Sequence, residues 1–153
     1  MDPSPTNATR LPGGDMARIL LVEDDESSQV LVSEMLRSGG HKVLVASDGQ
    51  EALRILKTDH FAAIVTDLRM PLVNGLRLIR ELRGAGDTIP IIAVSGVNWD
   101  QLPLAQDYGA NAALPKPLDR DKLLEVVDRV LSDTRSDWST AWIHPEFGSV
   151  GDY

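Results

Sequence analysis

The stretch FAAIVTDLRMPLVNG, residues 61–75, gives the most informative local signal in this chain. It begins as a continuous apolar run, which is typical of a strand covered on both faces of a parallel sheet. The run ends on a carboxylate, Asp67, and Pro71 follows four residues later. A charge at the end of a buried strand lies at the rim of the sheet, where ligands bind in open α/β folds. The residues at the other strand ends therefore decide what Asp67 can do.

Apolar runs of the same kind recur along the chain and alternate with segments of helix length. The expected strands are RILLV at 18–22, KVLVA at 42–46, FAAIVT at 61–66, IPIIAVS at 89–95 and NAALP at 111–115. The expected helices occupy 27–38, 48–59, 72–84, a segment that starts near Asp100, and 119–133. Five strands alternating with five helices predict an α/β fold with a doubly wound, five-stranded parallel sheet, right-handed crossovers and helices on both faces.

Local signals refine the predicted starts and lengths of three of these helices. Asp25 and Glu26 are expected to cap the first helix, because acidic groups at a helix start interact favourably with its unsatisfied amides. Pro103 is tolerable only in a first turn, so the fourth helix is predicted to be short or irregular. Asp119 is the expected N-cap of the last helix. The apolar stripe of that helix comprises Leu123, Leu124, Val127, Val130 and Leu131.

The composition indicates one domain without disulfides. The chain has 153 residues, 42% of them hydrophobic and 25% charged, which suffices for one core and is too short for two ordinary domains. It has no cysteine, which excludes disulfides and thiolate metal sites. No apolar run approaches the roughly 20 residues needed to cross a bilayer, so a cytoplasmic location without membrane binding is expected. A net charge of −8 argues against direct DNA binding.

The two ends of the chain depart from the alternating pattern. Residues 1–15 are rich in Pro, Gly, Ser, Thr and Asn and are expected to form a disordered leader ahead of a domain at 16–131. Residues 132–153 are too few for a DNA-binding output domain. This tail either packs back on the domain or contacts a partner. It holds four of the seven aromatic residues of the chain, namely Trp138, Trp142, Phe147 and Tyr153.

Acidic residues gather at the strand ends that the predicted sheet brings to one rim. Those ends carry Glu23, Asp24, Asp25, Asp67, Ser95, Gly96 and Lys116. Clustered carboxylates repel one another unless a cation lies between them, and Mg²⁺ is usually held by one or two carboxylates, waters and a phosphate. With the metal bound, Asp67 is a candidate nucleophile for a phosphoryl group, and Ser95 and Lys116 are candidate phosphate ligands. Gly96 leaves room for the incoming group.

Other interpretations of the same residues are weaker or stay open. The first strand is followed by EDDES, residues 23–27, rather than by a glycine-rich loop, which argues against a dinucleotide site. A dehalogenase-type phosphatase needs an Asp-x-Asp after the first strand, whereas the isolated Asp67 follows the third. Taken alone, Asp67 reads as a turn residue or helix cap, and Ser95 as an ordinary strand-end hydroxyl.

Four sequence blocks together resemble the receiver domains of bacterial two-component response regulators. Each block alone is weak evidence, whereas the four in the family's order and at suitable spacing are far more specific. The resemblance covers about residues 17–131 and implies the flavodoxin-like (βα)5 receiver fold. The blocks are ILLVEDDE at 19–26, IVTDLRMPLVNG at 64–75, IIAVSG at 91–96 and ALPKPL at 113–118.

The resemblance implies a role for each acidic residue of the rim. Asp67 would accept a phosphoryl group from a phosphohistidine on a sensor histidine kinase or a histidine phosphotransfer protein. The resemblance implies four Mg²⁺ ligands: Glu23, Asp24, Asp67 and the backbone carbonyl of Arg69.

The switch positions match the family only in part. Ser95 stands where receivers have the switch hydroxyl, and Lys116 would be the lysine that contacts the phosphate, followed by a Lys116-Pro117 bond that is commonly cis in the family. Three residues before that lysine, receivers often carry a Tyr or Phe whose rotation reports phosphorylation, but this chain has Ala113. We therefore expect the signal to leave by backbone or loop movement.

The favoured hypothesis is a single-domain response regulator that depends on Mg²⁺ and signals to an unknown downstream protein by contact or onward phosphotransfer. It would be no enzyme beyond weak self-phosphorylation and autodephosphorylation. His41, His60 and His144 lie away from the rim and are expected on the surface, so the phosphodonor would be another protein. A homodimer could form through the fourth helix, fifth strand and fifth helix, or through the tail. The alternatives are a phosphorylation-independent pseudo-receiver scaffold and a receiver fragment of a hybrid histidine kinase; a free-standing phosphatase would need a substrate pocket and general acid that the sequence does not reveal.

Overall fold

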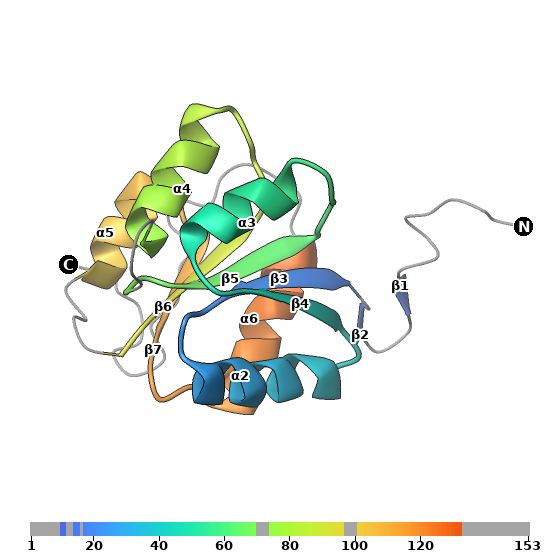
Figure 1. Ribbon diagram of the computed structural model, residues 1–153. Helices are drawn as coiled ribbons and strands as arrows, with labels where there is room; N and C mark the ends of the chain where they lie inside the picture. The colour runs from blue at the N-terminus through green and yellow to red at the C-terminus, as the bar shows by residue number, and fades with distance from the viewer. Residues whose placement is uncertain (1–9, 12–13, 16, 70–73, 97–100, 133–153) are drawn as a thin grey trace, which may run out of the picture.

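A parallel sheet of five strands lies at the centre of the molecule (Figure 1). The computed structural model describes residues 10–11, 14–15, 17–69, 74–96 and 101–132. The strands are β3 (Arg18–Val22), β4 (Lys42–Ala46), β5 (Ala63–Asp67), β6 (Ile91–Ser95) and β7 (Ala112–Pro115). Their order in the sheet is β4-β3-β5-β6-β7, and all neighbours are parallel. This order reverses beside β3, as in flavodoxin-like doubly wound folds, and the predicted fold class is confirmed.

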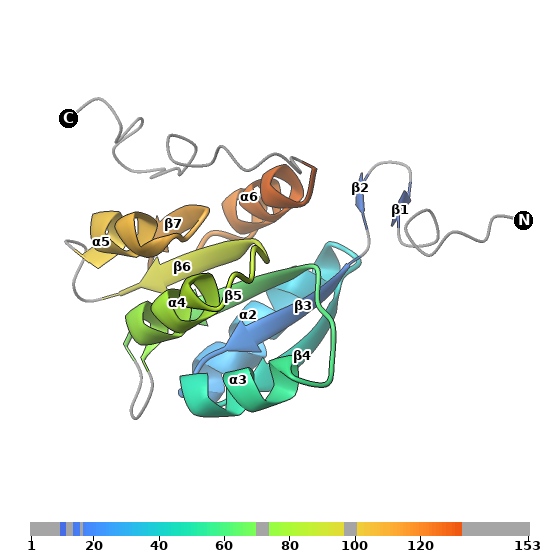
Figure 2. The ribbon, with the colours of Figure 1, turned by 90° about the horizontal axis from the view of Figure 1, so that it is seen from above.

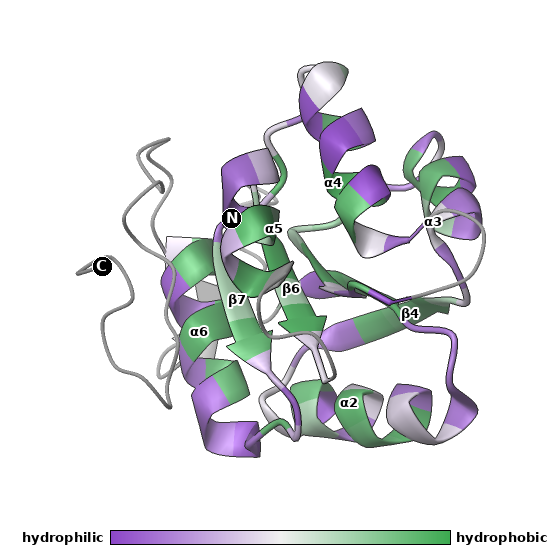
Figure 3. Cartoon of the chain, turned by 90° about the vertical axis from the view of Figure 1, so that its left-hand side faces the viewer, coloured by the Kyte–Doolittle hydropathy of each residue, from purple (hydrophilic) through white to green (hydrophobic). Residues whose placement is uncertain are grey.

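Helices cover both faces of this sheet (Figure 2). They are α2 (Glu26–Ser38), α3 (Gly49–Leu56), α4 (Gly75–Gly84), α5 (Gln101–Tyr108) and α6 (Arg120–Ser132). One face packs on α2 and α6, and the other on α3, α4 and α5. Alternate residues of β3 separate into the two cores, since Ile19 and Leu21 join the first and Leu20 and Val22 the second. Figure 3 shows the hydrophobic residues gathered along β6, β7 and the neighbouring sides of the helices.

The predicted helix signals are confirmed where the structure describes them. Asp25 caps α2, where its carboxylate accepts from the Ser28 amide at 2.8 Å. Asp119 caps α6 through the Lys122 amide at 3.0 Å. Helix α5 is short, with eight residues, and Pro103 falls in its first turn. In α6, Val126 is buried although it was left out of the predicted stripe, whereas Leu124 and Leu131 are only half-buried.

Two sequence predictions about burial are wrong. The strand KVLVA is not covered on both faces, because β4 lies at the edge of the sheet and leaves Leu44 39% exposed. His41 is not a surface residue: it is 4% exposed, and its Nδ1 accepts from the Ala17 amide at 3.2 Å. His60 is exposed, as predicted, and His144 lies outside the described residues.

The first fifteen residues contain a short pair of strands. The strands β1 (Arg10–Leu11) and β2 (Gly14–Asp15) pair antiparallel. These four residues depart from the expected disordered leader, since backbone pairing needs no apolar side chains. Residues 1–9, 12–13 and 16 lie outside the described residues, as does the aromatic tail from residue 133 onward. None of the helices in the described part of the chain has the length and apolar character that a membrane span requires.

Candidate functional site

Two buried carboxylates meet where the order of the strands reverses. Asp67 is the last residue of β5, and Glu23 directly follows β3, whose Val22 pairs with Thr66 of β5. Asp67 is 8% exposed and Glu23 3% exposed. The Glu23 amide donates to the Ala46 carbonyl at 2.9 Å, so the backbone carrying this carboxylate is held by the sheet. The topology therefore brings together two acids that are 44 positions apart in the sequence.

Lys116 connects these two acids from the far side of the site. Its Nζ donates to Asp67 Oδ2 at 2.9 Å and to Glu23 Oε1 at 3.1 Å. Lys116 follows β7, and its amide donates to the Ser95 carbonyl at 2.9 Å, which extends the pairing of β7 with β6. A Cβ at Gly96 would come within 3.2 Å of the Lys116 stem. The glycine thus makes room for the lysine, and the Lys116-Pro117 bond that follows is cis, as the resemblance implied.

The second oxygen of each carboxylate accepts from the backbone. The Arg69 amide donates to Asp67 Oδ1 at 3.0 Å, and the Asp25 amide donates to Glu23 Oε2 at 3.1 Å. In addition, the side-chain amide of Gln29 donates to the Glu23 carbonyl at 2.7 Å. Each acid is therefore fixed at both oxygens, by Lys116 on one side and by an amide of the following loop on the other. The sequence predicts only a helix cap at Asp25, and its backbone contact with Glu23 is visible only in the structure.

Glu23, Asp24 and Asp67 together offer a set of oxygen ligands for a cation. One carboxylate oxygen from each lies within 4.8 Å of the others, and Asp24 is the exposed member of the set. Octahedral Mg²⁺ holds oxygens at about 2.0–2.1 Å, so its neighbouring ligands lie roughly 3–4 Å apart and the observed spacing needs little adjustment. Three carboxylates and the Lys116 ammonium leave two negative charges, which a divalent cation balances. The set fits Mg²⁺, and the Arg69 carbonyl remains a sequence prediction as a further ligand.

Burial and charge shift two pKa values in the site. Burial raises the pKa of Glu23, and the charge of Asp67 adds to this, although the hydrogen bonds from Asp25 and Lys116 oppose it. Burial lowers the pKa of Lys116, but its hydrogen bonds and charge interactions with Asp67 and Glu23 outweigh that effect and leave the pKa raised. The ammonium therefore stays charged at neutral pH.

The two predicted switch positions lie on the neighbouring strands β6 and β7. Ser95 ends β6, next to the end of β5, and is 1% exposed, so its hydroxyl belongs to the same rim as Asp67. Ala113 is fully buried in β7, within the core under α3, α4 and α5. The aromatic side chain that many receivers carry at this position is absent here. The ring of Tyr108, which packs against that same core, lies under the Arg80 guanidinium at 5.4 Å.

Gly75 shapes the loop behind Asp67 and was not recognised as a site residue from the sequence. A Cβ at this position would collide with the Asp67 carbonyl oxygen and lie 2.8 Å from the Leu68 Cα. Helix α4 can start this close to β5 only because residue 75 lacks a side chain. Asn74 caps the helix through the Arg77 amide at 2.9 Å. The signal was present in the sequence, since an Asn-Gly pair between a strand and a helix marks a tight start.

Comparisons with known proteins agree with this geometry. The family model of the response regulator receiver domain matches residues 19–128. A response regulator receiver protein of Anaeromyxobacter sp. is 37% identical over 112 residues, which cover 72% of this chain and 47% of the relative. The response regulator MprA of Mycobacterium tuberculosis is 36% identical over 119 residues, which cover 77% of this chain and 52% of the relative. The chain thus spans about half the length of the curated relatives it matches.

Solved structures give the same result. The receiver domain of a Pseudomonas aeruginosa sensor histidine kinase has a TM-score of 0.71 and 32% identity, with 76% of this chain and 98% of that chain covered. That structure holds a magnesium ion in its active site cleft. The matched region, the strand order and the acidic rim lead to one conclusion. The chain belongs to the family of response regulator receiver domains.

Proposed function

We propose that Asp67 accepts a phosphoryl group from a phosphohistidine on a sensor histidine kinase or histidine phosphotransfer protein, in a reaction that requires Mg²⁺. One observation carries this proposal: the buried Asp67 carboxylate is held between the Lys116 ammonium and the Arg69 amide, beside Glu23 and Asp24. A carboxylate fixed in this way presents an oriented nucleophile next to a place for a cation.

The residues of the chain then have separate tasks during transfer. An oxygen of Asp67 forms the new bond to phosphorus, the bond from phosphorus to the donor imidazole nitrogen breaks, and that nitrogen takes up a proton from water. Lys116 stays charged and pairs with a phosphoryl oxygen, and Ser95 donates its hydroxyl to another. Mg²⁺, when bound by Glu23, Asp24 and Asp67, supplies positive charge that offsets the phosphoryl oxygens.

The donor in this proposal is a separate protein. The two described histidines, His41 and His60, precede β4 and β5 and thus lie at the opposite edge of the sheet from Asp67. Next to the acceptor, a groove of about 420 Å³ runs between the start of α2 and the loop after β7, with Leu31, Gly96, Lys116 and Leu118 among its lining residues. Leu31 is 54% exposed, and its neighbour Val30 59%. This apolar surface suits a protein partner that brings its phosphohistidine to Asp67.

Phosphorylation by a small donor tests the acceptor. We expect the intact mass to increase by one phosphoryl group when the protein is incubated with Mg²⁺ and acetyl phosphate. Asp67→Asn abolishes the increase, whereas Asp25→Asn preserves it, because Asp25 caps α2 with its side chain and Asn caps a helix equally well. An unmodified wild-type chain, or full modification of Asp67→Asn, contradicts the proposal.

The partner surface has its own test. Leu31→Lys should slow transfer from a panel of phosphorylated histidine kinases and histidine phosphotransfer proteins, and leave the reaction with acetyl phosphate unchanged. Leu44→Lys is the matched control, because Leu44 is an exposed leucine on the edge strand β4. Equal slowing by both variants would remove α2 from the docking surface.

A receiver fragment of a hybrid histidine kinase is the alternative arrangement, and it is supported by the matched Pseudomonas aeruginosa domain, which is the receiver domain of a sensor histidine kinase. Ala113, in place of an aromatic switch residue, favours a second candidate: a scaffold that binds its partner without phosphate. The two functions differ in one measurement. A phosphorylation-dependent regulator in the cytoplasm, which signals by contact or onward transfer, loses its output in the Asp67→Asn variant. A scaffold still binds its partner in that variant.

A further inference from the structure

One side chain of α2 holds the loop that carries two of the three candidate cation ligands. This acidic loop comprises residues 23–25. Gln29, at the end of the first turn of α2, donates from its side-chain amide to the Glu23 carbonyl at 2.7 Å. Its backbone amide donates to the Asp25 carbonyl at 2.9 Å, a bond that any residue except proline could form. Gln29 therefore ties the backbone on both sides of Asp24, and one of the two ties depends on its side chain.

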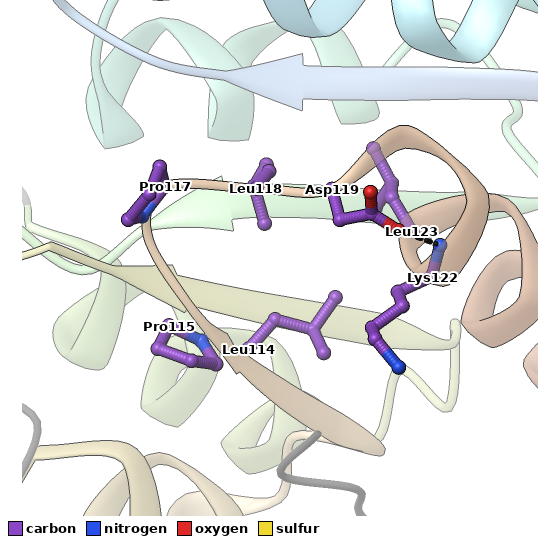
Figure 4. A pocket seen from close by; sticks show the side chains of 7 residues that line it. All are labelled: Leu114, Pro115, Pro117, Leu118, Asp119, Lys122 and Leu123. Carbon is purple, nitrogen blue, oxygen red and sulfur yellow. Dashed lines mark hydrogen bonds between the residues drawn. The ribbon is translucent and has the colours of Figure 1, made fainter. Parts of the chain in front are cut away.

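The other charged groups of the site are held by different means. Asp67 is buried at the end of β5, and both of its carboxylate oxygens accept hydrogen bonds. Lys116 lies between two prolines, and Figure 4 shows Pro115 and Pro117 on the loop after β7. Both prolines also line a groove of about 420 Å³ beside the first turn of α6. Because a proline ring fixes φ and the Lys116 amide pairs with the end of β6, this loop is held by its own backbone.

The Asp24 carboxylate lacks comparable support. It is the exposed member of the acidic set. Within the described ranges of the chain, no group donates a hydrogen bond to this carboxylate and no side-chain cation pairs with it. Its place therefore depends on the backbone that carries it. The peptide group between Glu23 and Asp24 is planar, so the bond from Gln29 to its carbonyl oxygen also fixes the direction in which the chain enters Asp24.

We infer that Gln29 is a positioning residue of the cation site, which keeps the acidic loop in the conformation that brings Asp24 to the other two acids. A ligand that is held in place before the cation arrives loses less conformational freedom on binding, so the affinity is higher. The inference deepens the proposed function, and only its effect on phosphorylation rests on that function. Its effects on the loop and on Mg²⁺ binding require only the acidic set.

Mg²⁺ binding to Gln29→Met tests the inference. Methionine has a similar length and no charge, but it cannot donate the hydrogen bond. We expect calorimetric titration at neutral pH to show roughly 3- to 10-fold weaker Mg²⁺ binding than in the wild type, because one bond to a ligand-bearing loop is lost. Gln50→Met, at an exposed position in the first turn of α3, is the matched control and should keep the wild-type affinity. Unchanged affinity in Gln29→Met, or an equal loss in both variants, would overturn the inference.

The rate of phosphorylation by acetyl phosphate separates positioning from a general structural defect. In Gln29→Met, the Mg²⁺ concentration that gives half of the maximal rate should rise by the same factor as the dissociation constant. The rate at saturating Mg²⁺ should stay within about twofold of the wild type, because the bound cation then holds the loop in place. A reduced rate at saturating Mg²⁺, with an unchanged half-saturating concentration, would contradict the role of Gln29 in cation binding.

Hydrogen exchange without Mg²⁺ or phosphate tests the loop by itself. The Asp25 amide donates to Glu23 Oε2 at 3.1 Å, so its exchange reports how often the acidic loop opens. Gln29→Met should exchange several-fold faster at this amide, whereas the amides of β3 should exchange as in the wild type. Equal exchange of the Asp25 amide in both proteins would show that Gln29 does not hold the loop. If Asp67 were not the acceptor, phosphorylation would be absent in the wild type as well, and the exchange and Mg²⁺ titration would still decide the role of Gln29.

Discussion

Lys116 sets the charge balance of the site. Its ammonium bonds both Glu23 and Asp67, at 3.1 and 2.9 Å, and both acids are buried. Without it, two negative charges would face each other in a poorly solvated environment. The lysine that the proposed transfer assigns to phosphate is therefore also expected to stabilise the resting protein.

Removal of this ammonium should destabilise the protein. Loss of one partner from a buried ion pair costs about 3–5 kcal/mol, and because the Lys116 side chain is 24% exposed we expect roughly 1–3 kcal/mol for Lys116→Met. Added Mg²⁺ should recover part of this loss, since it replaces the missing positive charge. Urea unfolding with and without Mg²⁺ measures both effects. Lys57→Met, on the surface, is the control and should change stability by less than about 0.5 kcal/mol.

The raised pKa of Glu23 predicts how Mg²⁺ binding depends on pH. A carboxyl whose pKa is raised by folding favours the protonated form, so it contributes stability at low pH that is lost as the pH rises through the folded-state value. Mg²⁺ needs the ionised form. We therefore expect the affinity for Mg²⁺ to fall on acidification, with a midpoint above the ordinary value of 4.5.

Calorimetric titration with Mg²⁺ at a series of pH values, from neutral pH down to the ordinary value of 4.5, checks the prediction. Glu23→Gln should bind Mg²⁺ more weakly at neutral pH and show a flatter pH dependence, because the group that titrates is gone. Asp25→Asn should retain the wild-type profile. If Glu23→Gln and the wild type had the same profile, another group would control the binding.

At the scale of elements, the contact between β5 and the start of α4 depends on Gly75. In an exposed helix, Gly→Ala usually stabilises by about 0.5–1 kcal/mol. At Gly75 the sign should reverse, because the new Cβ would overlap the Asp67 carbonyl, and we expect a loss of roughly 1–3 kcal/mol together with weaker phosphorylation. Gly84→Ala, in the same helix with open space around the position, should be neutral or stabilising. Thermal unfolding of the two variants measures the difference in stability. Equal changes in stability would exclude a special contact at Gly75.

Arg83 joins α4 to the segment between α5 and β7. Its guanidinium donates to the carbonyls of Gly109 at 3.0 Å and Asp87 at 2.8 Å, and to Asn111 Oδ1 at 3.0 Å. The same Asn111 oxygen accepts from the Ile91 amide at 2.7 Å, so β6 is included. A lysine cannot reproduce this fork.

We expect Arg83→Lys to lower the free energy of unfolding by roughly 1–2 kcal/mol, because half-buried acceptors lose their donors. Arg80→Lys, one turn away and with its guanidinium over the ring of Tyr108, should cost less than about 0.5 kcal/mol. Chemical denaturation of the two variants makes the comparison. A larger loss for Arg80→Lys would show that the fork contributes little.

Most elements could be predicted from the sequence because their signals are local. Apolar runs mark β3, β5, β6 and β7, and Asp25 and Asp119 cap the helices expected for them. The partly exposed face of β4 could not be predicted, since an apolar run looks the same at the edge of a sheet as in its centre. The burial of His41 likewise depends on a contact with Ala17, 24 residues away.

The residues of the site can likewise be divided into those that the sequence predicts and those that it does not. Glu23, Asp24, Asp67, Ser95 and Lys116 could be predicted because parallel strands bring all their carboxyl ends to one edge. The amide donors to the two acids, and the close approach at residue 75, are set by loop conformation. Side-chain chemistry gives no sign of a backbone amide that points at a carboxylate.

For the molecule as a whole, the strand order explains why the candidate site residues gather at one edge of the sheet. The reversal beside β3 brings together the loops after β3 and β5, and the loop after β7 adds the lysine (Figure 1). The same loop after β7 separates the groove beside α2 from the groove beside α6. The two grooves and the acidic cluster are therefore neighbours, although their residues come from distant parts of the sequence.

The position of the phosphoryl group tests the central claim most directly. After incubation with Mg²⁺ and acetyl phosphate, borohydride converts an aspartyl phosphate to homoserine, and peptide mass spectrometry then locates the converted residue. We predict homoserine at position 67 alone, and none when Mg²⁺ is removed by a chelator. Homoserine at position 24 or 25, or conversion that does not need Mg²⁺, would contradict the assignment of Asp67 as the acceptor.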